Sequence, residues 1–535
     1  MAQQIFQNYP PPLSEQQQVY LSTYVKNWTI QHGLTVRPSA AQVSEEVNPN
    51  AVLATNAPVS LFPSPFPRKL FKQAQSLQTV YNELYAAIAS NETFLESVMK
   101  ELIDVDDFLS NLWKIHLDVK AEGYTHEHAL GLFRSDFMLD AATDTVKQVE
   151  FNTISSSFGG LSSLVTQLHT ELASFPAPAT SLAYPPHPLF KTSGRPNHPP
   201  PNEAVPTLAR GLASAHKAYG PAKSSPALPL CVLFLVQPSE RNIFDQLALS
   251  SRMHTSHNVA TFRLPTTSVL EQTTIGTSSP SRPLIYHPPS APGTAYEVTT
   301  VYFRALYAPS EYTSPTFWQA RHHLERSAAI KCPSILLHLS GSKKIQQVLT
   351  STEPDHLGSF LPNASAATLD SLRSTFAPQY ALDSEGLALA TNPDTAAHHV
   401  LKPQREGGGN NIYRDNIPPF LASMPEKDYK QYILMELIHP PASAHNTVLR
   451  SDGEVVSGDV ISELGTFGTC LWKTPRPHDA DAPKQGEAPS TPEILHNEEG
   501  GYLLRTKASG SDEGGVATGF SSLDSVLLYD DEHLH

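Results

Sequence analysis

Cysteine and long apolar runs are both scarce in this sequence. Cys231, Cys332 and Cys470 stand far apart among 535 residues and form neither a CxxC pair nor a zinc-type pattern. Such sparse use gives no disulfide framework and is typical of a reducing compartment. No stretch approaches the roughly 20 apolar residues that a membrane helix needs. The start, MAQQIFQNYP, lacks the basic and apolar parts of a signal peptide. The sequence therefore predicts a cytoplasmic protein.

Basic residues are also fewer than acidic residues. The chain carries 37 Lys and Arg against 52 Asp and Glu, a formal net charge of −15 at pH 7. This balance argues against nucleic acid or an anionic membrane as the main partner, so a few placed basic residues must hold any anionic ligand. The length and the 40% hydrophobic content predict a globular protein of two or three domains or one large composite.

Apolar residues in the first third recur at three- and four-residue steps, which predicts helices with one buried face. One stripe covers residues 70–88 and a second covers residues 94–112. The segments FRSDFMLD and VKQVEFNTI, separated by AATDT, then predict a β-hairpin. A proline-rich stretch from Pro176 to about Pro206 predicts a surface connection, because proline cannot continue a helix or a central strand.

The second half of the chain is richer in predicted strands. LCVLFLVQ and VTTVYFR flank a helical NIFDQLAL and an irregular stretch near 264–294, which predicts a small α/β domain with parallel pairing. HHVLKP, QYILMELI and VVSGDVISELGTFGTCLW predict three more strands, the second and third paired antiparallel. A polar segment from Pro475 to about Glu499 predicts a disordered loop.

The segment LKPQREGGGNN, residues 401–411, combines a lysine, a glutamate and three glycines. Lys402 ends a strand with a compact positive charge, and Glu406 offers a hard oxygen ligand for Mg²⁺. Consecutive glycines let backbone N–H groups approach a phosphate closely. The segment is not a Walker loop, because the lysine does not follow the glycines. For the glycines alone, a flexible surface loop is the alternative interpretation.

A second polar segment is VEFNTISSSFGGL, residues 149–161. Glu150 and Asn152 alternate along a predicted strand, so their side chains share one face. A carboxylate and an amide oxygen beside a serine- and glycine-rich turn suit a metal–phosphate site. The alternative is a solvent-facing polar strand edge.

A third segment is LLRTKASGSDEGGVATG, residues 503–519. Arg505 and Lys507 also alternate onto one face, where they can hold an anion. The four glycines between 510 and 519 are typical of a lid that closes over a substrate. The alternative is an exposed loop with incidental charge.

Taken together, these residue types meet the needs of ATP-dependent ligation. Cations neutralise the triphosphate, oxygen ligands hold Mg²⁺ against it, and a closing loop keeps water from an activated acyl phosphate. Nine segments, in order, resemble the eukaryotic-type glutathione synthetase family: RSDFMLD, EFNTISSSFGGL, ERNIFDQ, VYFR, SGSKKIQQ, LKPQREGGGNN, ILMELI, SELGTFG and LLRTKA with the following GGVA. They extend from about residue 134 to 517.

The resemblance implies an ATP-grasp fold of the α/β (α+β) class, in which antiparallel sheets hold the nucleotide between them. It implies a helical N-terminal part and an inserted parallel α/β substrate-binding domain. We expect residues 1–225 and 341–535 to form the two parts of the ATP-grasp body, and residues 226–340 to form the inserted domain.

The resemblance also implies the ligands of the nucleotide and the metal. Glu150, Asn152 and Glu406 match the Mg²⁺ ligands of the family. The nucleotide-binding positions are Glu150, Lys343, Lys402, Pro403, Gln404, Arg405, Glu406, Gly407, Gly408, Gly409, Asn410, Asn411, Tyr413, Met435, Glu436, Leu437, Ile438, Glu463, Lys507 and Glu513. Leu437 stands where the family often has lysine, which alters one contact of the adenine-binding segment 435–438.

For the dipeptide γ-glutamylcysteine, the matching positions are Arg134, Ile154, Ser155, Ser156, Ser157, Glu240, Arg241, Asn242, Gln246, Arg304, Ala305, Leu306, Tyr307 and Arg505. Glu240 and Arg304 can pair with the ammonium and carboxylate of the γ-glutamyl end. Arg134 and Arg505 resemble catalytic residues that stabilise the reacting carboxylate and the oxyanion. Val516 and Ala517 match the pair that selects glycine. Ala305 replaces an acid of many relatives.

The implied reaction joins γ-glutamylcysteine and glycine to glutathione through an acyl phosphate, with ATP as co-substrate and Mg²⁺ as cofactor. No protein nucleophile is needed, so catalysis rests on positioning and electrostatics. The expected partners are these small molecules and a second copy of the chain, with no nucleic acid and no membrane. Two alternatives stay open: a nucleotide-binding protein without activity, and a ligase that uses another amino acid such as β-alanine.

Overall fold

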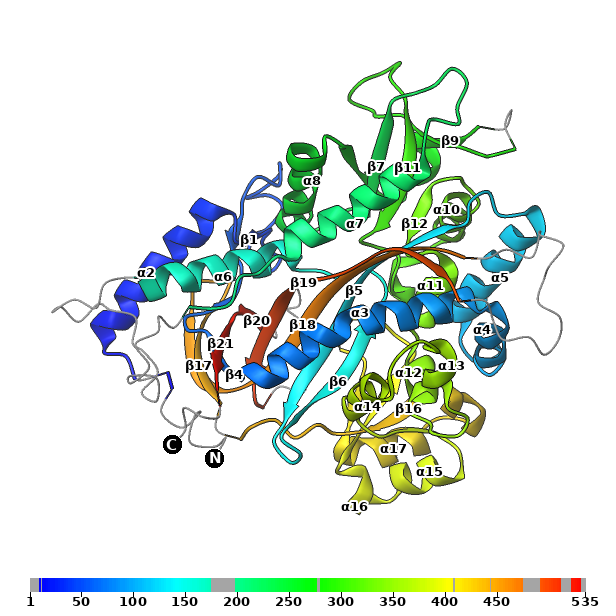
Figure 1. Cartoon of the computed structure of the whole chain (residues 1–535). Coiled ribbons are helices and arrows are strands. Elements are labelled where there is room, and N and C mark those ends of the chain that lie inside the picture. Colours follow the sequence, from blue (N-terminus) through cyan, green and yellow to red (C-terminus); the bar gives the residue numbers. More distant parts are fainter. Residues whose placement is uncertain are drawn as a thin grey trace.

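The computed structural model describes residues 9–10, 12–174, 198–276, 280–407, 409–442, 444–474, 491–510 and 521–530. Its largest sheets have seven, six and four strands, and helices pack around each of them (Figure 1). Across these described ranges, none of the helices is both long enough and apolar enough to cross a membrane.

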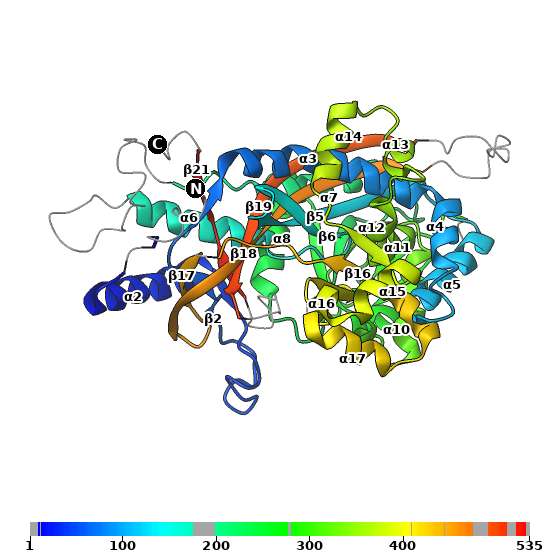
Figure 2. The ribbon, with the colours of Figure 1, turned by 90° about the horizontal axis from the view of Figure 1, so that it is seen from below.

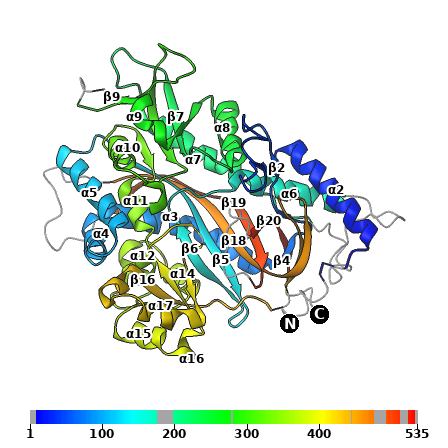
Figure 3. The same cartoon turned by 180° about the vertical axis from the view of Figure 1, so that it is seen from behind.

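The seven-stranded sheet is the centre of the molecule, and Figure 3 shows its strands from β6 through β5, β18 and β19 to β20 side by side. Its order is β17 (His445–Leu449), β3 (Val59–Ser60), β20 (Ser521–Asp524), β19 (Glu493–Ala508), β18 (Val455–Lys473), β5 (His128–Asp140) and β6 (Thr145–Asn152). Its pairings are antiparallel except that of β20 with β3. The predicted hairpin is confirmed as β5 and β6.

Helices cover both faces of this sheet. Gly468 of β18 lies against Asn82 of α3 (Arg68–Ser90), and the next residue, Thr469, lies against Gly211 of α7 (Ala204–Tyr219). Because successive strand residues point to opposite faces, α3 and α7 pack on opposite sides. The first apolar stripe is therefore confirmed as the buried face of α3.

The second apolar stripe belongs to two helices, not one: α4 (Glu92–Met99) and α5 (Asp107–Glu122). The break has a local cause. Asp106 accepts hydrogen bonds from the backbone N–H groups of Phe108 (3.0 Å) and Leu109 (3.1 Å), which starts a new helix.

The six-stranded sheet contains the predicted parallel unit. β7 (Leu230–Val236) pairs parallel with β11 (Tyr296–Phe303) and with β8 (Ala260–Pro265), and β11 pairs parallel with β12 (Ile330–Cys332). Helix α8 (Ile243–His257) follows β7 as predicted. The stretch near 264–294 is not simply irregular, because β9 (Thr273–Ile275) and β10 (Leu284–Tyr286) add an antiparallel edge. These strands are too short to show a periodic pattern.

The four-stranded sheet is antiparallel, in the order β13 (Gln379–Ala381), β16 (Tyr432–Glu436), β14 (His399–Pro403) and β15 (Ile412–Tyr413). The predicted pairing of β16 with β18 is wrong. β18 instead pairs with β5, β19 and the short strand β17, which directly precedes it and forms its hairpin partner.

Two predicted connections are shorter than expected. α7 begins at Ala204 and places Pro206 in its first turn, where the missing N–H is no loss. β19 begins at Glu493, and this residue pairs with Lys473 of β18. Residues 175–197 and 475–490 lie outside the described residues.

The remaining elements are α2 (Glu15–His32), β1 (Thr35–Val36), β2 (Thr55–Asn56), β4 (Ser64–Pro67), α6 (Gly159–Ser174), η2 (Thr266–Ser268), α9 (Val269–Gln272), η3 (Pro309–Glu311), α10 (Pro315–Glu325), α11 (Ile335–Ser340), α12 (Lys343–Leu349), α13 (His356–Phe360), α14 (Ala366–Ser374), α15 (Ser384–Thr391), α16 (Pro393–Ala396), η4 (Arg414–Asn416), α17 (Ile417–Ala422), η5 (Glu426–Gln431) and β21 (Val526–Tyr529). Figure 2 shows α2 and the four-stranded sheet's helices α15, α16 and α17 at opposite ends of the molecule.

Candidate active site

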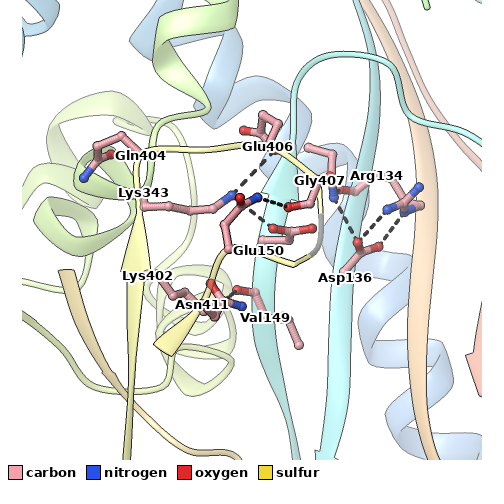
Figure 4. A network of polar contacts seen from close by, with 12 residues as sticks. Arg134, Asp136, Val149, Glu150, Lys343, Lys402, Gln404, Glu406, Gly407 and Asn411 are labelled. Atoms are coloured by element: carbon pink, nitrogen blue, oxygen red, sulfur yellow. Dashed lines mark hydrogen bonds and ion pairs between the residues drawn. The ribbon is translucent and has the colours of Figure 1, made fainter. Parts of the chain in front are cut away.

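Strands β5 and β6 place four polar side chains on one face of the central sheet. The register pairs Arg134 with Asn152 and Asp136 with Glu150, and residues two apart along a strand share a face. The prediction that Glu150 and Asn152 face the same way agrees with this register. In Figure 4, this face of the sheet lies opposite the strand–loop segment that carries Lys402 and Glu406.

Lys343 joins the central sheet to that segment. It begins α12, and its Nζ lies 3.0 Å from Glu150 Oε2 and 3.6 Å from Glu406 Oε2 (Figure 4). Lys402, at the end of β14, donates through Nζ to the carbonyl of Val149 at 2.8 Å. A helix start, a strand and a loop thus bring two ammonium groups and two carboxylates to one place.

The pKa values of these groups show how closely they interact. Burial opposes ionisation of Glu150, but Lys343, Lys402 and Arg505 outweigh it and hold its pKa at about 2. Burial beside Glu150 raises the pKa of Glu406 to about 7, although Lys343 partly offsets the shift. Burial lowers the pKa of Lys402 to about 8, with Lys343 contributing. Three cationic neighbours therefore hold Glu150 ionised, whereas burial beside that carboxylate disfavours ionisation of Glu406.

The donor set fits a small hard cation. Glu150 and Glu406 both reach the same ammonium group, so they lie close enough to share one ion. Asn152 donates through Nδ2 to Asp136 Oδ2 (3.0 Å) and to the carbonyl of Arg134 (3.1 Å), which fixes its amide beside them. Carboxylate and amide oxygens are ligands that Mg²⁺ accepts. Across the described part of the chain, no group of three His, Cys, Asp or Glu side chains forms a metal cluster.

Two arginines extend the site along the sheet. Arg134 donates to Asp136 through Nε (2.6 Å) and Nη2 (2.7 Å), and Arg505 donates to the same carboxylate through Nη2 (2.9 Å). Arg505 also pairs with Glu463 across β18 and β19. Burial raises the pKa of Glu463, and the neighbouring Asp136 and Glu150 add to that shift.

A second group of residues connects the six-stranded sheet and its helix α8 to the turn after β6. Arg304, at the end of β11, donates through Nη2 to Ser157 Oγ (2.8 Å) and to Asp245 Oδ2 (3.0 Å). The same aspartate accepts hydrogen bonds from the N–H groups of Phe158 (2.9 Å) and Gly160 (2.7 Å). Arg304 Nε and Nη1 are buried with no partner among the described atoms, so they are donors that a ligand carboxylate can satisfy.

Glu240 lies at the other end of this group. Its carboxylate accepts hydrogen bonds from the N–H of Asn242 (2.7 Å) and from Nε2 of Gln246 (2.6 Å). Arg263 donates to Gln246 Oε1 at 3.0 Å. The Arg241 side chain instead donates its Nε to the carbonyl of Arg37 at 3.1 Å, toward the N-terminal segment.

Gly407 and residues 409–411 are the described part of the glycine-rich loop, which follows Glu406 of the cluster. Gly407 has φ 83°, a left-handed conformation that favours glycine, and a Cβ there would come within 3.7 Å of the Tyr307 ring. Asn410 donates to the carbonyl of Gly407 at 3.2 Å, and Asn411 donates to the Tyr413 hydroxyl at 3.1 Å. Gly407 thus lies near both Glu406 of the lysine–carboxylate cluster and Tyr307, which follows β11 of the six-stranded sheet.

The segment 435–438 leaves β16 beside an apolar cluster formed by Ala377, Val400, Met435, Tyr413, Leu437 and Ile438. The N–H of Glu436 donates to the carbonyl of Pro378 (3.0 Å), and that of Leu437 donates to the carbonyl of His398 (2.9 Å). Because these two donors are in use, contacts to a base from this segment must come from its other backbone groups.

Other predicted residues lie around the site and contact neighbouring elements. Gln404 Oε1 accepts from the N–H of Lys344 at 2.9 Å, and the Arg405 guanidinium pairs with Asp106, which caps α5. Ile154, Ala305 and Leu306 are buried in or beside the core of the inserted domain. Ser155, Ser156, Pro403, Gly409 and Lys507 lie on the elements described above. Gly408, Glu513, Val516 and Ala517 lie outside the described residues, and so does most of the predicted lid.

Two acidic residues at the centre of the site are absent from the sequence prediction. Asp136 accepts hydrogen bonds from Arg134, Arg505 and Asn152, and Asp245 connects Arg304 to the turn after β6. The spacing of Asp136, two residues after Arg134 on the same strand face, is a signal that was available in the sequence. Asp245 sits next to Gln246 in NIFDQLAL without a comparable signal.

The cysteines stand apart from both groups. Cys231 lies in β7, Cys332 in β12 and Cys470 in β18, all buried and unpaired. Burial raises the pKa of each thiol well above its usual range. Such thiols are poor nucleophiles.

Comparison with known proteins is consistent with this arrangement. The family described as eukaryotic glutathione synthase, ATP binding domain, matches residues 15–528. The chain is 37% identical to the chloroplastic glutathione synthetase of Solanum lycopersicum over 478 residues, which are 88% of this chain and 78% of that protein. It is 36% identical over 499 residues to the glutathione synthetase large chain of Schizosaccharomyces pombe (89% and 92%), and 37% identical over 483 residues to glutathione synthetase of Xenopus laevis (88% and 90%).

A glutathione synthetase-like effector from Globodera pallida, solved in its apoform, has the same fold. The TM-score is 0.69 at 20% sequence identity, and the superposition covers 97% of this chain and 98% of that one. The mixed architecture of antiparallel sheets with an inserted parallel unit is thus shared with a solved structure. By the extent of the family match and of the identity to its relatives, the chain belongs to the eukaryotic glutathione synthase family.

Proposed function

We propose that this protein is an ATP-dependent ligase that joins γ-glutamylcysteine to glycine and forms glutathione, with release of ADP and phosphate. The observation that carries the proposal is the convergence of Lys343, Lys402, Glu150 and Glu406 beside the glycine-rich loop. That cluster offers cations for a triphosphate and oxygen ligands for its counterion. It lies between the seven-stranded and four-stranded sheets, where an ATP-grasp fold holds its nucleotide.

In the first step, a carboxylate oxygen of the cysteinyl residue attacks the γ-phosphorus of ATP. A P–O bond forms to the peptide as the bond to the ADP oxygen breaks. Lys343 and Lys402 hold the phosphate oxygens, and Arg134 and Arg505 orient the peptide carboxylate. No side chain becomes covalently attached, so the rate depends on alignment and on charge stabilisation.

In the second step, the amine of glycine attacks the carbonyl carbon of the acyl phosphate. The C–N bond forms, phosphate leaves, and the amine loses a proton to become the amide. Charge that develops on the carbonyl oxygen lies within reach of Arg134 and Arg505. Arg304 and Glu240 hold the distant γ-glutamyl carboxylate and ammonium, so the peptide is anchored away from the reacting atoms.

Mg²⁺ fits the cluster through Glu150, Glu406 and Asn152. When bound, it would neutralise phosphate oxygens and make the γ-phosphorus a better electrophile. Lys343 stands between the two carboxylates and offsets the repulsion between them. This role for Lys343 follows from its distances of 3.0 and 3.6 Å to them.

The apolar cluster around Met435 and Val400 supports a place for adenine beside the segment 435–438. Glu463 is proposed as the ribose contact. We also propose a division into 1–225, 226–340 and 341–535, action in the cytoplasm and assembly as a homodimer. The three free, buried thiols are consistent with a reducing compartment, and sedimentation measures the assembly directly.

The test is phosphate release from ATP by the purified protein with γ-glutamylcysteine and Mg²⁺, with glycine, β-alanine or no acceptor added. Glycine should support turnover and a product of the mass of glutathione. Turnover preferring β-alanine would make the protein a ligase for another amino acid. ATP binding without phosphate release under every condition would make it a non-catalytic nucleotide-binding protein.

A further inference from the structure

Asp136 stands out among the acidic side chains of the site because it contacts the proposed functional residues and is itself sealed from solvent. Its exposed fraction is 0%, and that of Arg134 is 4%. It lies on β5 between β6 and β18, at the centre of the sheet face that carries the site. Burying a carboxylate costs free energy unless hydrogen-bond donors satisfy it, so the donors around Asp136 explain how it can be buried.

Four hydrogen bonds reach this carboxylate from three side chains. Arg134 donates two of them in a fork, at 2.6 Å to Oδ1 and 2.7 Å to Oδ2. Arg505 (2.9 Å) and Asn152 (3.0 Å) donate to Oδ2 as well. These three residues come from β5, β19 and β6, so one carboxylate sets the relative positions of groups from three strands.

The charge arrangement makes the carboxylate necessary. Arg134 is buried and Arg505 is partly buried, and both cations bond to one carboxylate, without which they would repel each other. Glu463 of β18 also pairs with Arg505, whereas Arg134 donates to Asp136 and, through Nη1, to the Ser157 carbonyl at 3.3 Å. Loss of Asp136 would therefore free the Arg134 guanidinium more than that of Arg505.

The neighbouring strand leaves room for the pair. Gly465 of β18 lies opposite Asp136 in the register, and a Cβ there would come within 2.8 Å of Asp136 Oδ1 and 2.7 Å of Arg134 Cδ. Contacts this short force something to move. Gly465, the first glycine in SELGTFG, is thus explained by the space that the Arg134–Asp136 fork occupies.

We propose that Asp136 is a positioning residue for the ligase reaction: it holds the guanidinium groups of Arg134 and Arg505 and the amide of Asn152 in the geometry that the peptide carboxylate and the metal require. The inference rests on the proposed function. It goes further by naming a residue that contacts neither substrate nor metal and acts through three residues that do.

The primary variant is Asp136→Asn, which keeps the size but replaces one accepting oxygen with a donor. The matched control is Asp140→Asn on the same strand, whose carboxylate accepts hydrogen bonds from the Thr143 hydroxyl and the His439 N–H and, among the described contacts, touches neither arginine nor the lysine–carboxylate cluster. We expect Asp136→Asn to lower kcat/KM for γ-glutamylcysteine by about 100-fold, the size expected for a misplacement of about 1 Å. KM for ATP and the melting temperature should change no more than in the control.

A double-mutant cycle separates positioning from general support. In an Arg134→Ala background, Asp136→Asn should cost at least about tenfold less than it does in the native background, because its main target is already gone. If the two losses multiply, or if Asp136→Asn is as active as Asp140→Asn, the inference is overturned. Gly465→Ala, which keeps the carboxylate but crowds the fork, should affect the same kinetic parameter.

A crystal structure of Asp136→Asn provides a readout that does not depend on activity. The Arg134 guanidinium should leave its position, whereas an unmoved guanidinium contradicts the inference. If the native protein forms no glutathione, the proposed function fails. The guanidinium position still reports on Asp136.

Discussion

Glu150 and Glu406 show how much a single charge matters at this site. Each is a proposed oxygen ligand, and both contact Lys343. We expect Glu150→Gln and Glu406→Gln each to lower glutathione formation by at least about 100-fold, since even outer partners of a metal site are worth about 10–100-fold. The measurement is turnover at saturating Mg²⁺ together with a melting curve. Glu101→Gln, which breaks the Lys344–Glu101 pair outside the cluster, is the control.

One carboxylate remains beside Lys343 in either variant, so the fold should persist. Near-normal turnover in both variants would contradict the assignment of these residues as metal ligands.

For the three cysteines we expect the opposite result: substitution should lower stability and leave turnover unchanged. Cys231, Cys332 and Cys470 are buried, and no contact of theirs reaches the cluster among the described hydrogen bonds. Replacing each by alanine should reduce the free energy of unfolding by about 1 kcal/mol, as is usual for a small core truncation. Turnover should stay close to that of the native protein. A stably folded single variant without activity would refute the proposed mechanism, because that mechanism uses no thiol.

At the scale of elements, the glycine-rich loop is the segment most sensitive to backbone change. Gly407 has φ 83°, and an L side chain at such an angle costs about 1–2 kcal/mol of strain. Gly407→Ala should therefore raise KM for ATP and lower kcat, because the strain favours loop conformations other than the one that binds phosphate. Steady-state kinetics against ATP measures the effect.

Gly453→Ala is the matched control, since Gly453 has φ 88° in the turn between β17 and β18, away from the site. A similar cost in stability is expected there, with unchanged kinetics. Equal kinetic behaviour of the two variants would show that the strain at Gly407 is not coupled to nucleotide binding.

At the scale of the whole molecule, buried histidines connect distant parts of the chain and should make stability depend on pH. His169 of α6 bonds the Ser60 carbonyl (2.9 Å) and the Ser525 hydroxyl (2.6 Å). Burial lowers its pKa to about 4 from an ordinary 6.5. The folded state thus favours the neutral ring, so its contribution is present above pH 6.5 and is lost as pH falls toward 4. Fully lost, it amounts to about 3 kcal/mol.

His169→Gln should therefore weaken the fall in unfolding free energy between pH 7 and pH 5, measured by urea titration. Part of the dependence of the unfolding free energy on pH should remain, because His323 has a pKa of about 4 and His338 has a pKa of about 3. Asp524 acts in the opposite sense, because burial raises its pKa to about 6 and its contribution is lost as pH rises. His254→Gln, at an exposed position of α8, is the control, and an unchanged slope in His169→Gln would contradict the assignment.

Local patterns along the chain determined a large part of this protein. The period of the stripe at 70–88 specified α3, and the two alternating runs around AATDT specified the β5–β6 hairpin, because both depend on near neighbours. The same alternation put Glu150 and Asn152 on one face. The ordered motifs from 134 to 517 identified the family, since residues that bind a common ligand keep their identity across long connections.

Only the tertiary structure decided what depends on partners far away in the chain. β18 pairs with β5 and β19 rather than with β16, because a sheet pairing is chosen by the whole fold and not by the nearest strand. Glu150 and Glu406 meet at Lys343 across more than two hundred residues, so the pKa of Glu406 follows from neighbours that its own segment does not contain. The central place of Asp136 has the same cause: its own strand supplies the carboxylate and Arg134, whereas β6 supplies the amide of Asn152 and β19 supplies the guanidinium of Arg505.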